Sequence, residues 1–510
     1  MDIRAQLNGF IWVAVLGKGT VVKIDTDTGH HYHDLISTYQ QQDVDLDLVF
    51  KDVAVYSTRV MGAAHVQNAT DLALRTALRR RGVAHLNFPV DLQEQEGGEH
   101  SKRNVPGHTS DIFTQQVALP AETELQRGAE ILNAGRKVVI LAGRGALGAG
   151  DVLEQVAEWL AAPIVKPLLG KAVVPDDSPY TTGGIGLPGT EPYQEALEDC
   201  DTLLIVGSSF PYIEYYPKPG QARGVQIEIE PERIGLRYPV EVGLVGDSRK
   251  VLEHLLPLLE TRTDRRFLEH AQDGMQKWWK LMEEQGTRPD VPMKPQVLAW
   301  ELGKRLREDA IVSCDSGTIA TWWARQIPVK RGQMHSLSGT LASMANGLSY
   351  AIAAQIAYPE RQCVAFIGDG GFSMLMAEFA TAVKYDLPIK VVIVKNNTLG
   401  QIKWEQMVFL GNPEYGVELQ PIDFAAFARA CGGNGFTIED PKICGEVLEE
   451  ALNTSGPVIV DAVVDPFEPP MPPKVSPEQA LKFAKSLVKG QPKRMKIAAT
   501  IAEDVVKEMI

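Results

Sequence analysis

The chain has 510 residues, more than one hydrophobic core of roughly 250 to 300 residues can organise, so two or three domains are expected. With 44% hydrophobic and 23% charged residues, and no apolar run near the ~18 residues that cross a bilayer, the composition excludes a membrane-spanning protein. The net charge of −14 argues against a nucleic-acid partner, because an acidic surface repels phosphate groups. Five cysteines without a Cys-x-x-Cys pair predict a reducing, cytoplasmic setting.

Helix-like and strand-like segments alternate along most of the chain, and this order predicts an α/β fold with three doubly wound parallel-sheet domains. The first domain is expected over residues 1–93, with a helix at Ala64–Arg81 and a strand at Val83–Val90. Residues 94–118 are rich in Glu, Gly, His, Ser and Asn and lack periodic apolar positions, which is typical of an exposed linker.

The second and third domains are expected over residues 119–285 and 296–468, separated by a segment that contains glycine and three prolines. The second domain opens with a helix, a strand at Lys137–Leu141 and a glycine-rich turn. Residues 469–510 begin with prolines and continue as two helical stretches. We interpret them as a surface tail that packs on the third domain; an amphipathic membrane contact is the less favoured alternative.

Two polar residues, Asp369 and Asn396, follow apolar segments that are expected to be parallel strands. Cys363–Phe366 leads into a Gly-Asp-Gly-Gly turn, and Ile389–Val394 leads into an Asn-Asn pair. Loops at the carboxyl ends of parallel strands form the edge at which open α/β sheets bind ligands. A carboxylate and an amide oxygen at this edge suit a hard cation that also holds phosphate oxygens, and the glycines let backbone amides approach those phosphates.

Each turn alone is weak evidence, because a Gly-Asp-Gly turn is usually only a tight turn and an Asn-Asn pair usually caps or turns a chain. Together, with a strand before each and a helix at Met374–Tyr385 between them, they indicate a ligand site. The run Gly368–Gly400 resembles the signature of thiamine-diphosphate enzymes, in which Gly-Asp-Gly is followed by Asn at the spacing seen here between Asp369 and Asn396.

This resemblance implies that Mg²⁺ is held by Asp369, Asn396 and the carbonyl of Thr398 and clamps the diphosphate of the cofactor. The family commonly has Asn where this chain has Lys395, and the ungapped register assigns the metal ligand to Asn396 rather than Asn397. The positions that the resemblance implies for cofactor contacts are Ser316, Gly317, Thr318, Ala342, Ser343, Met344, Asp369, Gly370, Gly371, Asn396, Asn397, Thr398, Leu399, Gly400, Gln401 and Ile402.

Two further residues have catalytic roles by resemblance. Met344 lies in the segment whose apolar side chain wedges between the two cofactor rings in the family; a space-filling core methionine is the alternative. Gln42 matches a Gln that approaches the substrate in relatives. The loop Gln401–Tyr415 either shapes the substrate side or forms an amphipathic surface helix.

The second domain resembles the flavin-binding domain of bacterial pyruvate oxidases, including the quinone-reducing pyruvate dehydrogenase. The segments that carry this resemblance are 207–212, 226–235 and 244–247. FAD is therefore expected as a second cofactor, although acetolactate synthases share much of the pattern. The implied FAD contacts are Ser208, Ser209, Phe210, Pro211, Ile229, Glu230, Pro231, Glu232, Arg233 and Asp247.

For function, the resemblance implies oxidative decarboxylation of pyruvate, with electrons passing to FAD and then to a quinone or another acceptor. Acetolactate synthase-like carboligation is the alternative within the enzyme class. Because family members bind the cofactor between the pyrimidine-binding domain of one subunit and the diphosphate-binding domain of another, a homodimer or homotetramer is expected.

The first domain resembles the family's pyrimidine-binding domain only from about Gly29, so we expect this domain to be truncated. Counting back from the matched segments places the family's activating glutamate before Met1, and the first glutamate of the chain is Glu94. Loss of such a general acid typically costs ~10² to 10⁴ in rate. Two hypotheses follow. The first is an active oxidase whose true start lies upstream of Met1 or whose missing part comes from elsewhere; the second is a cofactor-binding fragment or pseudoenzyme.

Overall fold

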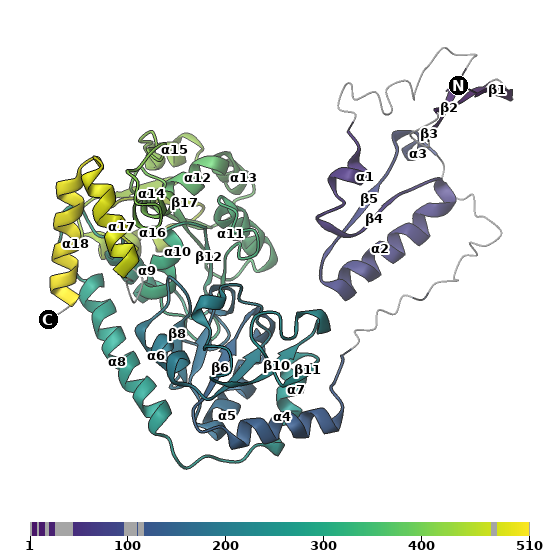
Figure 1. Cartoon of the computed structure of the whole chain (residues 1–510). Coiled ribbons are helices and arrows are strands. Elements are labelled where there is room, and N and C mark those ends of the chain that lie inside the picture. The colour runs from purple at the N-terminus through teal and green to yellow at the C-terminus, as the bar shows by residue number, and fades with distance from the viewer. Residues whose placement is uncertain are drawn as a thin grey trace. The chain divides into compact units, whose positions relative to one another are not determined.

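The computed structural model of the chain describes residues 3–7, 10–15, 20–25, 44–95, 110, 117–470 and 477–508. It divides into two compact units, Met1–Gln116 and Val117–Ile510 (Figure 1). Within the described ranges, no helix is both long enough and apolar enough to cross a membrane.

The described residues of the first unit form two small sheets. Three strands, β1 (Ile3–Leu7), β2 (Phe10–Val15) and β3 (Thr20–Asp25), pair antiparallel, and β4 (Ala54–Arg59) pairs parallel with β5 (Val83–Asn87). Its helices are α1 (Leu46–Val49), α2 (Val66–Arg80) and α3 (Val90–Gln93). The parallel pair agrees with the predicted fold, with α2 as its crossover. The antiparallel strands do not, because connections of two and four residues are too short for parallel pairing.

The central part of the second unit is a six-stranded sheet whose neighbouring strands are all parallel. The strands are β6 (Val138–Ala142), β7 (Ile164–Lys166), β8 (Thr181–Gly184), β9 (Thr202–Val206), β10 (Arg223–Glu228) and β11 (Val242–Val245). The helices are α4 (Glu122–Ala134), α5 (Gly150–Leu160), α6 (Glu191–Asp199), α7 (Ser248–Leu255) and α8 (Arg266–Gly286). The order β8-β7-β6-β9-β10-β11 is the 3-2-1-4-5-6 order of dinucleotide-binding folds.

The rest of the second unit holds another six-stranded parallel sheet, ordered β13-β12-β14-β15-β17-β16. The strands are β12 (Ile311–Cys314), β13 (Met334–Ser336), β14 (Cys363–Gly368), β15 (Lys390–Lys395), β16 (Asn434–Ile438) and β17 (Val458–Val463). The helices are α9 (Pro295–Arg305), α10 (Ile319–Gln326), α11 (Asn346–Ala357), α12 (Asp369–Leu375), α13 (Phe379–Lys384), α14 (Gly400–Val408), α15 (Phe424–Ala430) and α16 (Cys444–Asn453).

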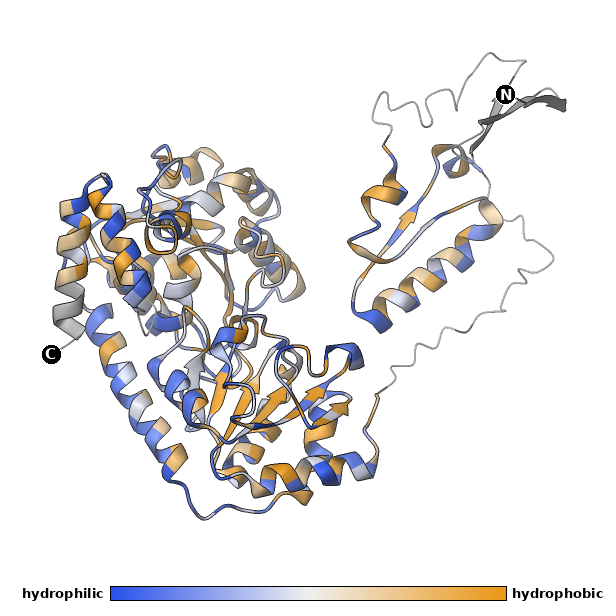
Figure 2. Ribbon diagram, viewed as in Figure 1, coloured by the Kyte–Doolittle hydropathy of each residue, from blue (hydrophilic) through white to orange (hydrophobic). Residues whose placement is uncertain are grey.

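Both faces of this sheet are covered, so its strands are continuously apolar rather than alternating. In β14, Val364 and Phe366 belong to one buried cluster and Ala365 and Ile367 to the cluster on the opposite face. The central sheet follows the same rule: its strands are mostly orange in Figure 2, whereas the surrounding helices alternate orange and blue. This doubly wound arrangement confirms the predicted α/β class.

A buried ion cluster joins the central and C-terminal parts of the second unit. Lys166 Nζ lies 2.7 Å from one carboxylate oxygen of Asp176, and Lys171 Nζ lies 3.3 Å from the other. Asp176 also accepts the backbone N–H of Val329 at 2.7 Å, and Lys171 donates to the carbonyl of Ala324 at 3.0 Å. Burial raises the pKa of Asp176, but the two ammonium groups outweigh burial and hold that pKa well below its usual range.

His335 on β13 is buried next to this cluster and is held neutral. Trp323 Nε1 donates to its Nδ1 at 3.1 Å, and its Nε2 lies 3.2 Å from Gln333 Oε1. Burial, reinforced by the charge of Lys171, lowers the pKa of His335 to about 3.

We therefore expect acid to destabilise the protein partly through His335. Its folded-state pKa is below the unfolded value of ~6.5, so the stability from the neutral ring is complete above pH ~6.5 and is lost as the pH falls toward 3, by about 1.4 kcal/mol per pH unit. Urea unfolding at pH 7.5 and pH 5.5 measures this loss. The variant His335→Gln, which cannot be protonated, should lose about 1.4 kcal/mol less than the wild type over that interval. Equal losses in the two proteins would contradict the assignment.

The C-terminal helices α17 (Pro477–Val488) and α18 (Arg494–Glu508), yellow in Figure 1, pack on α14 within the second unit. Helix α17 contacts α14, and Ile497 of α18 is buried in one cluster with Trp404 and Met407 of α14. Leu487 and Ile501 pack against the same cluster. Leu487, Ile497 and Ile501, which could have belonged to an amphipathic membrane-binding face, are thus used for packing within the chain, whereas Val488 is exposed.

Candidate active site

The predicted metal and cofactor residues lie at the carboxyl edge of the C-terminal sheet. Strands β12, β14 and β15 are neighbours, so the loops that leave them are adjacent. After β12 the chain adds β13 on one side and then returns to add β14 on the other. This reversal places the switch point of the sheet between β12 and β14, where open α/β sheets form their ligand crevice.

Asp369 is a buried carboxylate, 5% exposed, whose partners are backbone amides. Its Oδ1 accepts the N–H of Gly370 at 3.0 Å, and its Oδ2 accepts the N–H of Asn397 at 2.6 Å. No ion pair to Asp369 is found among the residues the structure describes in this domain. Burial raises the pKa of Asp369 to about 6, although the backbone amides of Asn397, Gly370 and Asn396 act in the opposite direction. A bound cation would supply a positive counter-charge for this buried carboxylate.

The sequence predicted a loop here and a single helix at Met374–Tyr385, and this prediction was wrong. Asp369 is the first residue of α12, which ends at Leu375, and α13 follows as a separate helix. Helix α12 can start at Asp369 because the next two residues, Gly370 and Gly371, have no side chains. A Cβ on Gly370 would lie 2.9 Å from Leu399, and one on Gly371 would overlap the carboxylate of Asp315. The first turn of α12 can therefore lie directly against its neighbouring loops.

The loop after β15 is fixed by a left-handed turn. Asn397 has φ 54°, a conformation that Asn tolerates better than most residues. The side chain of Asn396 accepts the N–H of Thr398 at 3.0 Å, and the carbonyl of Asn397 accepts the N–H of Leu419 at 3.0 Å. The carbonyl of Val417 accepts the N–H of Leu399 at 2.8 Å. This loop is thereby held against residues 417–419, with Asn396 and Thr398 beside Asp369.

The donor set fits a Mg²⁺ ion that grips a diphosphate. A carboxylate, a side-chain amide oxygen and a backbone carbonyl come from Asp369, Asn396 and Thr398, and all are the hard oxygen ligands that Mg²⁺ prefers. Space for the phosphates lies alongside. At Gly317, with φ 115°, and at Gly368, a Cβ would meet no heavy atom within 4 Å.

The other two predicted segments reach the same place. Ser316 Oγ donates to the carbonyl of Ser343 at 3.0 Å, which joins the loop after β12 to the segment that carries Met344. The terminal methyl of Met344 lies close to Gly370: a Cβ added to this glycine would be 3.6 Å from the methyl carbon. Likewise, Thr318 Oγ1 lies 3.1 Å from the position that a Cβ on Gly400 would occupy.

Three predicted contact residues have exposed or locally bonded side chains. Ala342 is exposed, Ile402 is 46% exposed on α14, and Gln401 donates to Glu405 at 2.9 Å on the same helix. Gln42 lies outside the described residues.

Sequence reasoning did not select Asp315 as a site residue. This carboxylate follows β12 directly and is 0% exposed; it accepts the N–H of Ser316 at 2.8 Å and that of Ala345 at 2.9 Å. The signal was present in the Cys-Asp-Ser-Gly-Thr run, where an acid immediately follows a buried strand. What the sequence does not show is that one of its partners, Ala345, is a backbone amide of a distant loop.

The predicted FAD contacts lie at the carboxyl ends of three neighbouring strands of the central sheet. Ser208–Pro211 follow β9, Ile229–Arg233 follow β10, and Asp247 follows β11. Phe210 packs with the rings of Tyr212, Tyr215 and Tyr216, and Glu230 forms an ion pair with Arg233. The carboxylate of Asp247 accepts the N–H of Lys250 at 3.2 Å, so it caps α7. This capping bond leaves other lone pairs of Asp247 for a ligand.

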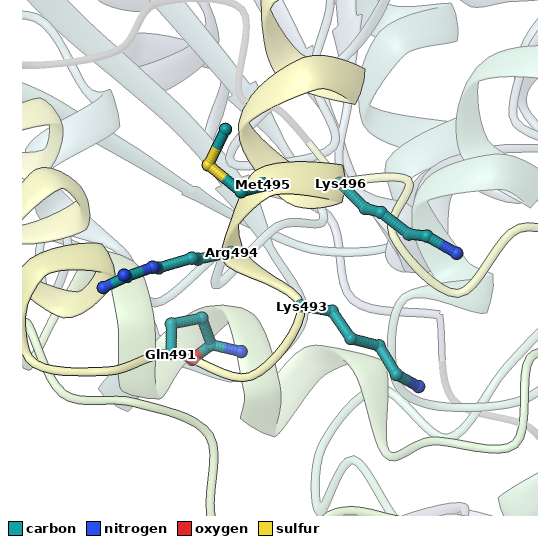
Figure 3. Close-up of a pocket in the computed structure, with 5 residues that line it drawn as sticks. All are labelled: Gln491, Lys493, Arg494, Met495 and Lys496. Atoms are coloured by element: carbon teal, nitrogen blue, oxygen red, sulfur yellow. The ribbon is translucent and has the colours of Figure 1, made fainter.

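Away from this edge, the C-terminal segment has a surface hollow of its own (Figure 3). Its lining residues are Gln491, Lys493, Arg494, Met495 and Lys496. In Figure 3 the side chains of Arg494 and Lys496 extend to opposite sides of the helix start, so they do not converge on a common ligand. None of the predicted site residues lines this hollow, and we assign it no role in the chemistry.

Comparison with known proteins identifies the family. Residues 125–255 match the model for the central domain of thiamine pyrophosphate enzymes, and residues 315–462 match the model for their C-terminal TPP binding domain. A Bacillus subtilis protein, YdaP, whose name describes it as thiamine pyrophosphate-containing, is 41% identical over 449 residues, which is 88% of this chain and 77% of YdaP. The chain belongs to the thiamine pyrophosphate enzymes. Thiamine pyrophosphate and thiamine diphosphate are the same compound.

Two other relatives of this thiamine pyrophosphate enzyme have more specific names. The pyruvate oxidase of Lactiplantibacillus plantarum is 30% identical over 431 residues, 83% of this chain and 70% of the oxidase. A Methanocaldococcus jannaschii protein named as an acetolactate synthase large subunit is 28% identical over 466 residues, 88% of this chain and 78% of its own length. The family is thus established, and its named relatives include both an oxidase and a carboligase.

Proposed function

We propose that this chain binds thiamine diphosphate through Mg²⁺ and catalyses the oxidative decarboxylation of pyruvate, with FAD passing the electrons to a quinone or another acceptor. The observation that carries the proposal is the buried carboxylate of Asp369, which bonds to the amide of Asn397 and has no cation among its described partners. Asn396 and Thr398 supply further oxygens beside it, and this set of oxygen donors suits Mg²⁺.

The roles of the residues follow from their positions. Asp369, Asn396 and the carbonyl of Thr398 would hold Mg²⁺, and the open backbone at Gly317 and Gly368 would receive the diphosphate. Met344 would separate the cofactor rings and exclude water from them. When bound, thiamine diphosphate supplies the carbon nucleophile that attacks a 2-oxo acid and the sink for the electrons released with carbon dioxide.

A flavin is supported by the central sheet and by one relative. The strand order is that of dinucleotide-binding folds, and the predicted FAD residues lie at the edge where such ligands bind. The relative named pyruvate oxidase has 30% identity. The alternative is acetolactate synthase-like carboligation, supported by the relative of that name at 28% identity. A flavin-binding domain does not by itself decide between these reactions.

We further propose a homodimer or homotetramer. Leu341 and Tyr415, which are 84% and 87% exposed, belong to the two loops that flank the site. Apolar side chains exposed to this degree beside a ligand site favour a covering surface from a second copy. Light scattering of the purified chain with thiamine diphosphate and Mg²⁺ tests this expectation, and a monomer under these conditions contradicts it.

The test of the reaction uses the full chain with thiamine diphosphate, Mg²⁺, FAD and pyruvate. Reduction of an added dye supports the oxidase, and acetolactate formed without an acceptor supports the carboligase. Cofactor binding without turnover supports the alternative of a cofactor-binding protein that lacks an activating acid. Failure to bind thiamine diphosphate in the presence of Mg²⁺ overturns the proposal as a whole.

A further inference from the structure

We propose that Asp315 is a positioning residue, which holds the segment of Met344 in place for the cofactor without touching the reacting atoms. This inference rests on the proposed thiamine diphosphate site. Asp315 is fully buried, and its two oxygens are assigned to different loops. Oδ1 accepts the N–H of Ser316 at 2.8 Å, and Oδ2 accepts the N–H of Ala345 at 2.9 Å, thirty residues further along the chain.

The bond to Ala345 holds a backbone conformation that alanine does not favour. Ala345 has φ 70° and ψ 0°, in the left-handed region, and it directly follows Met344 and precedes α11. Left-handed alanine persists only where surrounding contacts enforce it. Besides the carboxylate of Asp315, those contacts include the side-chain amide of Asn346, which donates to the carbonyl of Cys314 at 3.0 Å.

The same carboxylate also fixes the distance to α12. A Cβ on Gly371 would overlap Asp315 Oδ2, so helix and carboxylate are in direct contact. The neighbouring Gly370 is the residue against which the methyl of Met344 lies. One buried side chain therefore sets the relative positions of the diphosphate loop, the Met344 segment and the helix that begins with Asp369.

Asp315→Asn tests this role with almost no change of shape. An amide accepts hydrogen bonds on one side only, so its NH₂ group must face either the N–H of Ser316 or that of Ala345. If the NH₂ group faces Ala345, the bond to the Met344 segment is lost directly; if it faces Ser316, it loosens the residue whose Oγ bonds to the carbonyl of Ser343. In either orientation, Ala345 and Met344 should lose their fixed position. The readout is the NMR signal of the Met344 methyl group in protein labelled with ¹³C-methyl methionine and assigned with Met344→Leu. In the wild type, addition of thiamine diphosphate and Mg²⁺ should shift this signal, because an aromatic ring of the bound cofactor would lie against the methyl group.

In Asp315→Asn at saturating cofactor, we expect the shift to be lost or the methyl signal to broaden. We also expect turnover to fall about a hundredfold, which is the effect of misplacing a reacting group by about 1 Å. Ile438→Val, a buried change on the far strand β16, is the control for lost stability and should keep the wild-type shift. Gly371→Ala pushes on the same carboxylate from the other side and should reproduce the effect of Asp315→Asn.

A wild-type methyl shift in Asp315→Asn overturns the inference. If that variant does not fold, a wild-type shift in Gly371→Ala overturns it instead. A wild-type chain that fails to bind thiamine diphosphate has a different meaning: it overturns the proposed function, and the assigned role of Asp315 with it.

Discussion

Asp369→Asn is expected to weaken Mg²⁺-dependent binding of thiamine diphosphate by at least ~100-fold, the upper end of what loss of a supporting group costs a metal site. The change removes the one charged oxygen donor of the proposed set and leaves only the neutral oxygens of Asn396 and Thr398. Calorimetric titration of the cofactor at fixed Mg²⁺ measures the loss. Asp423→Asn is a matched control, because Asp423 caps α15 with a hydrogen bond to Ala426 in the same domain.

The same variant should not be less stable without the cofactor. Burial raises the pKa of Asp369 to about 6, which at pH 7 corresponds to a cost of roughly 3 kcal/mol for keeping the carboxylate charged. The amide avoids that cost, although it accepts fewer hydrogen bonds. Lost binding together with unchanged or increased unfolding free energy supports a functional carboxylate. Unchanged binding would remove Asp369 from the site.

Asp176→Asn is expected to destabilise the second unit by about 3 to 5 kcal/mol, because it leaves Lys166 and Lys171 buried without their counter-charge. Both ammonium groups bond to this one carboxylate, and each lysine is at most 7% exposed. Thermal and urea unfolding measure the loss. The central and C-terminal parts should also separate more easily, since Asp176 accepts the amide of Val329.

Two comparisons sharpen this prediction. Replacing Lys171 by Met in the Asp176→Asn background removes one of the stranded charges and should restore part of the stability. Glu241→Gln breaks the exposed pair with Arg223 and should change stability by less than about 1 kcal/mol. If the buried and the exposed variants behaved alike, the ion cluster would not be a structural link.

The sequence could predict that the loops carrying Asp369 and Asn396 lie next to each other, because this depends only on the strands that precede them. An apolar run before each turn places Asp369 and Asn396 at one sheet edge, and the structure has both there. The helix start at Asp369 could not be predicted, because a Gly-Gly pair ordinarily disfavours helix. Close contact with Leu399 and Asp315 overrides that propensity.

The sequence also could not predict which side chains from distant segments contact one another. Lys395 departs from the family pattern, and the sequence offered no role for it. In the structure its ammonium lies 3.2 Å from Asp461 on β17 and donates to the carbonyl of Ile422, so it joins neighbouring elements instead of facing the metal loop. The left-handed turn at Ala345 was equally hidden, because alanine carries no signal for that conformation.

The packing of the C-terminal helices on α14 has a practical consequence for handling this protein. Helix α14 begins at Gly400, two residues after Thr398, and its Trp404 and Met407 are covered by Ile497 and its neighbours. A shortened product ending near residue 470 would uncover an aromatic and a thioether side chain within three turns of the metal loop. Such a product should be prone to aggregation and poor at retaining cofactor, so preparations are best verified by intact mass before any activity is interpreted.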